Sequence, residues 1–358
     1  MNAKHLAAVL AGVFVAASAS AVPAPLTLTA ISTPFNSPIG IDYHQPTNSV
    51  LISANYPSGG PNNLERINFD GTHTPFSALS GLTDELKIAT VRSGNVGGFV
   101  TGQVFTGNGN DGEIVRVSPD GLTVNNAWVS LPGTGNGLLR GSMFVDRSGV
   151  WGGDLIAVTT GGELWRINSS GTPSTAAPLA SVGTHLEGLM TVPNDPLKYG
   201  PLAGKAIAGA ENQGLLYAFD LDGSFVTYNF GVAIEDIDLI DANENFFGVN
   251  FGTGRILGAP ASEFTGSVGK ILLTSETGGS SSGLFELSWN GTNFVTTEFL
   301  LAAGSSSRGQ WEHVTFAPAG IREVPPVGVP APATLGLMAA ALAGLGLRVR
   351  RSKRPLGC

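Results

Sequence analysis

Acidic side chains open several short apolar stretches of the sequence. They are Glu187 in EGLMTVP, Glu312 in EHVTFAP, and Glu235 with Asp236 in IEDIDLI. Carboxylates that lie close together repel one another, and a hard cation with oxygen ligands relieves that repulsion. These four residues therefore predict a metal site, and calcium is the cation we expect. The alternative is that the acids cap strand ends or bind neighbouring backbone amides.

Histidines stand beside two of these acids. His185 precedes Glu187 by two residues, and His313 directly follows Glu312. A histidine paired with a carboxylate can move protons near neutral pH, so His185 and His313 are the candidate catalytic residues of a hydrolase or lyase. The alternative is a solvated histidine, or one that binds a backbone carbonyl. The sequence has no nucleophile elbow, phosphate loop, dinucleotide fingerprint or zinc-protease motif, so whether the chain is an enzyme stays open.

A repeat supplies the elements that would position these residues. Five segments alternate apolar and polar residues and then enter a turn that closes on glycine. They are Leu64–Gly71, Ile114–Gly121, Leu164–Gly171, Leu216–Gly223 and Leu284–Gly291. The closing glycines lie 50, 50, 52 and 68 residues apart. The alternation predicts strands with one buried face, and the Asp-Gly, Ser-Gly and Asn-Gly pairs predict hairpin turns.

Further strand-like runs flank each repeat. One precedes it and one follows it, and a third lies upstream, as in Gly40–Pro46, Glu187–Pro193 and Glu312–Pro318. Four short strands per repeat predict an all-β fold, a β-propeller. We expect six blades, with five as the alternative, because Arg255–Gly269 is either an inserted loop or part of an additional blade. The run Leu26–Phe35 would supply the outer strand that closes the ring.

The body of the chain is acidic. Between its two ends it carries 13 Lys and Arg against 27 Asp and Glu, a formal charge of −14. Such a charge disfavours nucleic acid and anionic lipid as partners and is compatible with cation binding. The single cysteine, Cys358, is the last residue, so we expect neither a disulfide within the chain nor a cysteine-based metal site.

The N-terminal residues predict export. Lys4 is followed by an apolar stretch, Leu6–Ala17, and by the small residues Ala19–Ala21. This is the anatomy of a secretory signal peptide, which we expect over residues 1–21 with cleavage after Ala21. The propeller is then expected over residues 22–323.

The C-terminal residues predict a transient membrane contact. A Pro-rich linker over residues 324–332 ends in the motif Val329, Pro330, Ala331 and Pro332. A hydrophobic helix with a basic tail is expected over residues 333–358, and its basic cluster includes Arg348, Arg350 and Arg351. These cations should stay on the cytoplasmic side of the inner membrane, which leaves the body outside.

This tail resembles the PEP-CTERM sorting signal, which bacteria that make exopolysaccharide use with a membrane transpeptidase called exosortase. The usual motif of that family is Val-Pro-Glu-Pro, and Ala331 stands here where glutamate is typical. The resemblance covers residues 329–358. It implies exosortase as a partner, transient association with the inner membrane, and a final place at the cell surface or in the medium.

The repeat layout resembles the six-bladed propellers that include NHL-repeat proteins, SMP-30-type gluconolactonases and streptogramin lyases. The resemblance lies in the shape of the repeat, so no catalytic residue is carried over from those families. Two functions remain open beside that of a purely structural envelope protein, which would bind neither metal nor ligand. The first is a non-catalytic envelope or matrix propeller that binds exopolysaccharide, another glycan or a surface protein through one face of the ring. The second is a secreted calcium-dependent hydrolase or lyase with its site in the propeller channel.

Overall fold

The computed structural model describes residues 23–321, except 57–61, 69, 83, 133–136, 138–139, 141, 277–280 and 306–309. The signal peptide expected over residues 1–21 lies outside the described residues, and so do the linker, sorting motif and hydrophobic helix expected over residues 324–358. Within the described part of the chain, no helix has both the length and the apolar character needed to cross a membrane.

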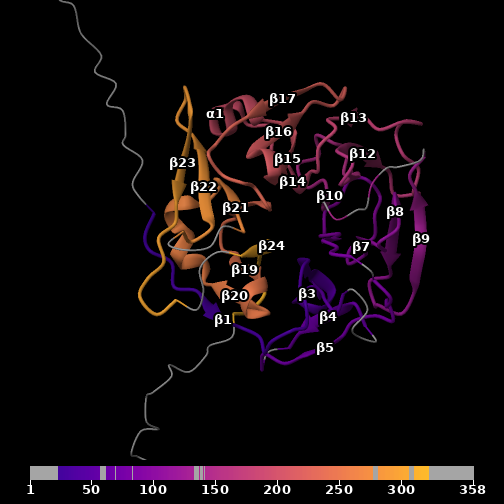
Figure 1. The fold of residues 1–358 in the computed structure, drawn as a ribbon, viewed down its shortest axis with the longest axis horizontal. Coiled ribbons are helices and arrows are strands. Elements are labelled where there is room, and N and C mark those ends of the chain that lie inside the picture. The colour runs from indigo at the N-terminus through magenta and orange to yellow at the C-terminus, as the bar shows by residue number, and fades with distance from the viewer. Residues whose placement is uncertain are drawn as a thin grey trace, which may run out of the picture.

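Six four-stranded antiparallel sheets surround a central axis (Figure 1). The expected all-β propeller is confirmed with six blades, and the alternative of five is wrong. Blade one contains β2 (Ile41–His44), β3 (Ser49–Ser53), β4 (Leu64–Ile67) and β5 (His73–Pro75), and blade two contains β6 (Ile88–Thr90), β7 (Val104–Gly107), β8 (Glu113–Val117) and β9 (Val124–Ser130). Blade three contains β10 (Ser142–Val145), β11 (Leu155–Val158), β12 (Glu163–Ile167) and β13 (Ala180–Ser181), and blade four contains β14 (Glu187–Thr191), β15 (Ala206–Ala210), β16 (Leu215–Phe219) and β17 (Phe225–Tyr228).

The last two blades complete the ring. Blade five contains β18 (Ile237–Leu239), β21 (Ile271–Thr274), β22 (Leu284–Trp289) and β23 (Phe294–Glu298), and blade six contains β24 (Trp311–Ala317), β19 (Asn245–Asn250), β20 (Arg255–Ala259) and β1 (Thr29–Ala30). The helical segments are short: α1 (Pro196–Tyr199), η1 (Gln45–Thr47), η2 (Gly200–Leu202), η3 (Glu211–Gln213), η4 (Phe251–Thr253) and η5 (Ala261–Ser267).

The five repeated segments form the third strands of blades one to five, namely β4, β8, β12, β16 and β22. Each closing glycine has a positive φ, between 76° and 95°, a conformation that a side chain disfavours. Two of these turns also press against the preceding blade. A Cβ on Gly121 would lie 2.0 Å from the carbonyl oxygen of Phe76, and one on Gly223 would lie 2.0 Å from that of Leu179. The turn therefore requires glycine for its positive φ, and at Gly121 and Gly223 the close contact between blades requires it as well.

Blades five and six exchange a hairpin. After β18 the chain crosses into blade six, forms β19 and β20 there, and returns to blade five for β21, β22 and β23. This excursion explains the long spacing of 68 residues between the last two closing glycines. Of the two expectations for Arg255–Gly269, part of an additional blade is confirmed, because β20 begins it and η5 follows.

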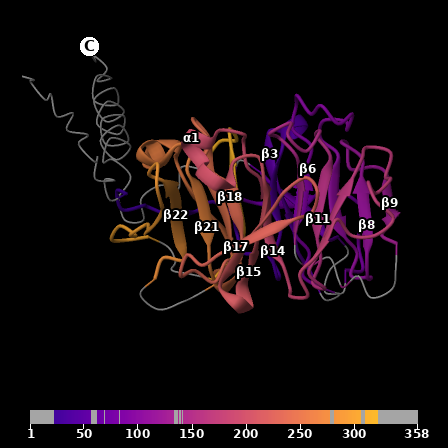
Figure 2. The same ribbon diagram turned by 90° about the horizontal axis from the view of Figure 1, so that it is seen from above.

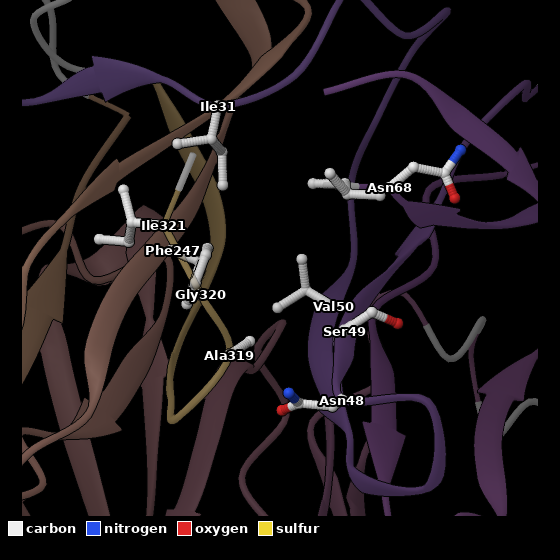
Figure 3. A pocket seen from close by; sticks show the side chains of 10 residues that line it. Ile31, Asn48, Ser49, Val50, Asn68, Phe247, Ala319, Gly320 and Ile321 are labelled. Carbon is white, nitrogen blue, oxygen red and sulfur yellow. The ribbon is translucent and has the colours of Figure 1, made fainter. Parts of the chain in front are cut away.

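Both ends of the described chain close the ring in blade six. β24 is its innermost strand, and β1 is its outer strand, where Thr29 pairs with Gly258 of β20. The expected closure by Leu26–Phe35 is thus confirmed. At the seam with blade one, Ile31, Phe247 and Ile321 face Val50 across a cavity of about 180 Å³ (Figure 3).

The core is divided among the blade interfaces. Six clusters of buried apolar side chains occur, one between each pair of neighbouring blades. Trp151, Trp165 and Trp311 are fully buried in them. Packing between the faces of adjacent sheets therefore stabilises the ring, and the innermost strands are left to present their side chains to the axis.

Candidate functional site

The ring axis is closed in its middle. One apolar side chain from each of the six innermost strands lines an axial cavity of about 20 Å³. They are Ile41, Ile88, Met143, Leu189, Ile237 and Val314. A cavity of this size holds about one water molecule. Two chemically separate ends of the axis therefore remain.

At the end where the innermost strands begin, acidic residues gather around one lysine. We call this group, Lys87 with Glu187, Glu235 and Glu312, the acidic mouth. The Nζ of Lys87 lies 2.6 Å from Oε1 of Glu235 and 3.3 Å from Oε2 of Glu187, and it donates to the carbonyl oxygen of Glu235 at 2.8 Å. Burial would lower the pKa of Lys87, but Glu235 and Glu187 raise it above the usual lysine value. The amine is therefore charged at neutral pH.

The two carboxyls that bind Lys87 differ in their tendency to ionise. Burial opposes ionisation of Glu187, but Lys87 and His185 hold its pKa well below the usual range. Burial and the nearby Glu187 raise the pKa of Glu235. Nε2 of His185 lies 2.7 Å from Oε1 of Glu187, and the histidine side chain is 22% exposed. His185 thus pairs with the acid beside which the sequence places it.

Glu312 is buried in the same mouth without an ion pair to Lys87 among the described residues. Burial and the neighbouring Glu276 raise the pKa of Glu312 to about 9. Its carboxyl is therefore protonated at neutral pH, while that of Glu187 is ionised. At the rim, Glu85 accepts a hydrogen bond from the hydroxyl of Tyr56 at 2.7 Å and forms an ion pair with Arg140.

Asp236 and His313 connect neighbouring blades. Oδ2 of Asp236 accepts from the amide of Val314 at 2.7 Å, and Nδ1 of His313 accepts from the amide of Ile41 at 3.0 Å. Burial raises the pKa of Asp236 to about 8, and burial with the nearby Lys87 lowers that of His313 to about 3. Innermost strands of adjacent blades share no backbone ladder, so side chains satisfy their amides. Asp236 follows the alternative in which the acids bind backbone amides. His313 follows neither of its alternatives, because its ring accepts from an amide and is not bound to the carbonyl of a described residue or left in solvent.

The four acids expected to hold calcium do not share one centre. Glu187 and Glu235 bind Lys87, Asp236 binds an amide of blade six, and Glu312 interacts with Glu276. Among the described residues, no three His, Cys, Asp or Glu side chains are grouped for metal binding. An ammonium group repels a divalent cation at the distances of this ion pair. The described residues therefore do not fit calcium while Lys87 stands among them.

The opposite end of the axis is built on two arginines. We call Asp42, Arg92, Arg147, Asp238 and Glu244 the arginine end. Arg92 donates to Glu244 at 3.0 Å and to the carbonyl of Phe316 at 2.5 Å. Asp42 accepts from the amide and hydroxyl of Thr90 at 2.7 and 3.0 Å, and from the hydroxyl of Thr315 at 3.2 Å. Burial would raise the pKa of Asp42, but Arg147 and Arg92 lower it. The same carboxylate thus joins blades one, two and six.

Three cations of the axis were missed by sequence reasoning. Lys87 lies between the buried Leu86 and Ile88 in ELKIATV, and a single lysine in such an apolar run was the available signal. Arg92 and Arg147 each stand just beyond an innermost strand, on blades two and three. This shared position could have indicated that both side chains turn towards the same end of the axis.

A second hollow lies on the outer flank between blades four and five. This flank groove has a volume of about 450 Å³ and is lined by residues of α1, β22 and β23. α1 contacts β22, and both are labelled in Figure 2. Trp289 and Phe294 stand in its wall with ring centroids 4.9 Å apart. A Cβ on Gly200 would lie 2.5 Å from Cδ2 of Trp289, so only glycine lets the backbone approach the indole this closely.

Charged side chains border the flank groove. Asp195 caps α1 by accepting from the amides of Leu197 and Lys198. Nζ of Lys270 lies 2.7 Å from Oε1 of the buried Glu286. Nζ of Lys198 lies 5.4 Å from the centre of the Tyr199 ring and has no carboxylate partner among the described residues. The groove therefore combines an aromatic wall with a polar rim.

No protein-family model matches the chain, and no curated protein matches it. Among solved structures, it is similar to virginiamycin B lyase from Staphylococcus aureus, with 13% identity, coverage of 78% of this chain and 89% of the lyase, and a TM-score of 0.45. It is also similar to a protein provisionally assigned as a gluconolactonase, with 11% identity, 85% and 95% coverage, and a TM-score of 0.48. A third is regucalcin, a calcium-binding protein from Agrobacterium tumefaciens, with 12% identity, 67% and 95% coverage, and a TM-score of 0.38. Functional assignment therefore depends on the side chains described above.

Proposed function

We propose that the chain is an exported, non-catalytic propeller that binds a glycan in the flank groove. The observation that carries the proposal is the contrast between two cavities. The axial cavity of about 20 Å³ admits no sugar, whereas the flank groove of about 450 Å³ lies within the range of small-molecule sites. The binding surface is then the flank of blades four and five.

The chemistry of the groove suits a sugar ring. One side of a pyranose presents C–H groups that pack on an aromatic face, and its hydroxyls require polar partners. Trp289 and Phe294 supply the aromatic surface, and Asp195, Lys198 and Lys270 supply charged groups at the edge. Trp151, Trp165 and Trp311 are fully buried, so they cannot serve as a platform.

The expected location outside the inner membrane supports a glycan partner. A signal peptide over residues 1–21 and a tail resembling PEP-CTERM would place the body outside the inner membrane, with exosortase as the processing partner. Exopolysaccharide is then a ligand that the propeller would meet. A surface protein remains the other partner class for this flank.

Affinity electrophoresis tests the proposal. The purified full-length chain is run in native gels that contain dextran, galactomannan or alginate, and retardation is measured against polysaccharide concentration. Trp289→Ala should weaken binding about tenfold, which corresponds to roughly 1.4 kcal/mol. Trp128→Ala is the matched control, because Trp128 is also partly buried but packs against Phe99 and Phe105 on blade two. Equal retardation of both variants and the wild type would count against the flank groove.

A second candidate function is hydrolase or lyase chemistry at the acidic mouth. One observation favours it: Glu312 is protonated and Glu187 is ionised at the same pH, which is the pairing that general acid–base catalysis uses. His185 beside Glu187 would orient that carboxylate or accept a proton. A screen on lactones and polysaccharides tests it, with Glu312→Gln and Glu187→Gln both expected to abolish turnover. Turnover that survives both substitutions would remove this candidate.

A further inference from the structure

The arginine end carries a cavity that neither proposed site uses. It has a volume of about 300 Å³ and lies between two chain segments, residues 92–96 after β6 and residues 145–149 after β10. Blades two and three, to which these strands belong, are neighbours in Figure 1 (β7 and β10). Arg92 and Arg147 both line it, so two cationic residues border one hollow. We call it the arginine pocket.

Arg147 has hydrogen-bonding capacity to spare. Its one hydrogen bond to a described residue runs from Nη2 to Oδ1 of Asp42 at 3.5 Å, and its side chain is 28% exposed. Its guanidinium also lies over the ring of Phe144, 4.9 Å from the centroid. A guanidinium has five N–H donors. Most of those of Arg147 therefore have no acceptor among the described residues.

Arg92 adds a second unsatisfied donor. Its terminal nitrogens bind Glu244 and the carbonyl of Phe316, but its Nε is buried and has no partner among the described residues. A buried N–H without an acceptor is unfavourable, and an incoming oxygen would relieve it. Burial and the charge of Arg92 also lower the pKa of Arg147, while Asp42 and Asp238 oppose that shift.

The acids near the pocket are already occupied. Asp146 lines it, but its carboxylate accepts from the amides of Ser148, Trp151 and Gly153 and from the hydroxyl of Thr191. Asp42 is bound by Thr90 and Thr315 in addition to the arginines. Neither carboxylate is free to neutralise Arg147 any further. The pocket thus offers unused N–H donors of Arg147, and its internal acceptors serve the fold.

We propose that the arginine pocket binds the carboxylate of a small organic monoacid, with the guanidinium of Arg147 as its main anchor. A planar carboxylate matches the fork of a guanidinium and can accept two parallel hydrogen bonds. Val96 and Val145 supply apolar wall for the carbon skeleton. A dianion such as phosphate fits less well, because Asp42, Asp238 and Glu244 surround the same arginines and repel extra negative charge.

Binding of sodium glucuronate to the purified full-length chain tests this proposal. Glucose is the matched neutral ligand, inorganic phosphate is the dianion, and ionic strength is kept constant. We expect a saturable rise in the unfolding midpoint with glucuronate, with Kd of the order of 1 mM, and no comparable response to glucose or phosphate. No saturable binding of glucuronate, or equal responses to glucose or phosphate, would overturn the proposal.

Variants locate the site. Arg147→Gln should weaken glucuronate binding about tenfold. Arg116→Gln is the matched control, because Arg116 also lies over an aromatic ring, 5.2 Å from Trp128, but outside the pocket. Val96→Glu supplies a second test with little risk to folding, since Val96 is 71% exposed and lines the pocket. It should weaken binding about threefold by repulsion, whereas Val96→Lys should not. Binding that neither Arg147→Gln nor Val96→Glu changes would refute this location.

Discussion

The two ends of the ring axis handle buried charge in different ways. At the acidic mouth, one lysine serves Glu235 and Glu187, and the remaining carboxyl, Glu312, stays protonated. At the arginine end, Arg92 and Arg147 face several carboxylates and cannot lose their protons. Unpaired acid is therefore relieved by protonation at the acidic mouth, while Arg147 at the arginine end keeps donors without acceptors among the described residues. Burial raises the pKa of Asp238 at the arginine end to about 7, so both ends respond to pH, and the proposed anion site belongs to the second.

The strongest test of the acidic mouth removes its cation. Lys87→Met leaves Glu235 and Glu187 buried without their partner, and we expect the free energy of unfolding at pH 7 to fall by about 3–5 kcal/mol. Urea unfolding of the full-length chain measures the loss. Lys198→Met is the control, because Lys198 is exposed and should change stability by less than about 0.5 kcal/mol. Equal effects of the two substitutions would mean that the mouth does not depend on Lys87.

The next test separates the two arginines. Arg92 is 13% exposed and joins Glu244 to the backbone of blade six, so Arg92→Gln should lower the free energy of unfolding by about 2–3 kcal/mol. Arg147 is 28% exposed and makes one weak hydrogen bond besides its contact with the Phe144 ring, so Arg147→Gln should lower the free energy of unfolding by less than about 1 kcal/mol. Urea unfolding compares both with the wild type. If Arg147→Gln is the more destabilising, Arg147 supports the fold and its donors are not free.

The pH response of the acidic mouth gives a smaller effect. Glu312 has a pKa of about 9 in the fold against an ordinary value of 4.5, so the folded chain holds this proton more tightly. Its contribution to stability is complete below the unfolded pKa and is lost as the pH rises through about 9. Glu312→Gln removes this loss. Between pH 6 and 9, the thermal unfolding midpoint of Glu312→Gln should fall by about 2–4 °C less than that of the wild type. Parallel curves would show that Glu312 is ionised in the folded chain at neutral pH.

The smallest expected effect concerns calcium. With Lys87 in place, millimolar calcium should leave the unfolding midpoint of the wild type unchanged, because the ammonium group already lies between Glu187 and Glu235 and repels a second cation. In Lys87→Met the same carboxylates lack a cation, and calcium should raise the midpoint by about 1–2 °C. Thermal unfolding with and without chelator measures both. A calcium shift in the wild type would restore the metal site that the sequence suggested.

Local turn chemistry made most of the fold predictable. Each third strand ends at a glycine that must adopt a positive φ, such as Gly71 or Gly121, and this requirement appears directly in the sequence. The closing role of Leu26–Phe35 was also predictable, because Glu312–Pro318 lacked successors. The exchanged hairpin of β19 and β20 was not. Its sequence is that of an ordinary hairpin. The strands that pair with it, β24 and β1, are distant in the chain, so local sequence does not indicate which blade it joins.

The candidate site was less predictable than the fold. Acid-rich windows correctly placed Glu187 and Glu235 close together, because both open innermost strands. They did not show that Lys87 of blade two would reach across to those acids from blades four and five. The direction of a side chain at the axis depends on all six blades. For the same reason, His185 faces an acid while His313 accepts a backbone amide.

The exchanged hairpin has a consequence for how the chain folds. Thr29 pairs with Gly258, 229 residues away, and β24 joins the same sheet near the end of the described chain. Blade six therefore cannot assemble until almost the whole sequence is available, and contacts of such high sequence separation form slowly. Under the proposed export, a chain that is translocated as it leaves the ribosome would cross the membrane before its ring can close. Slow closure would thus keep the polypeptide competent for translocation, and the propeller would lock only on the far side.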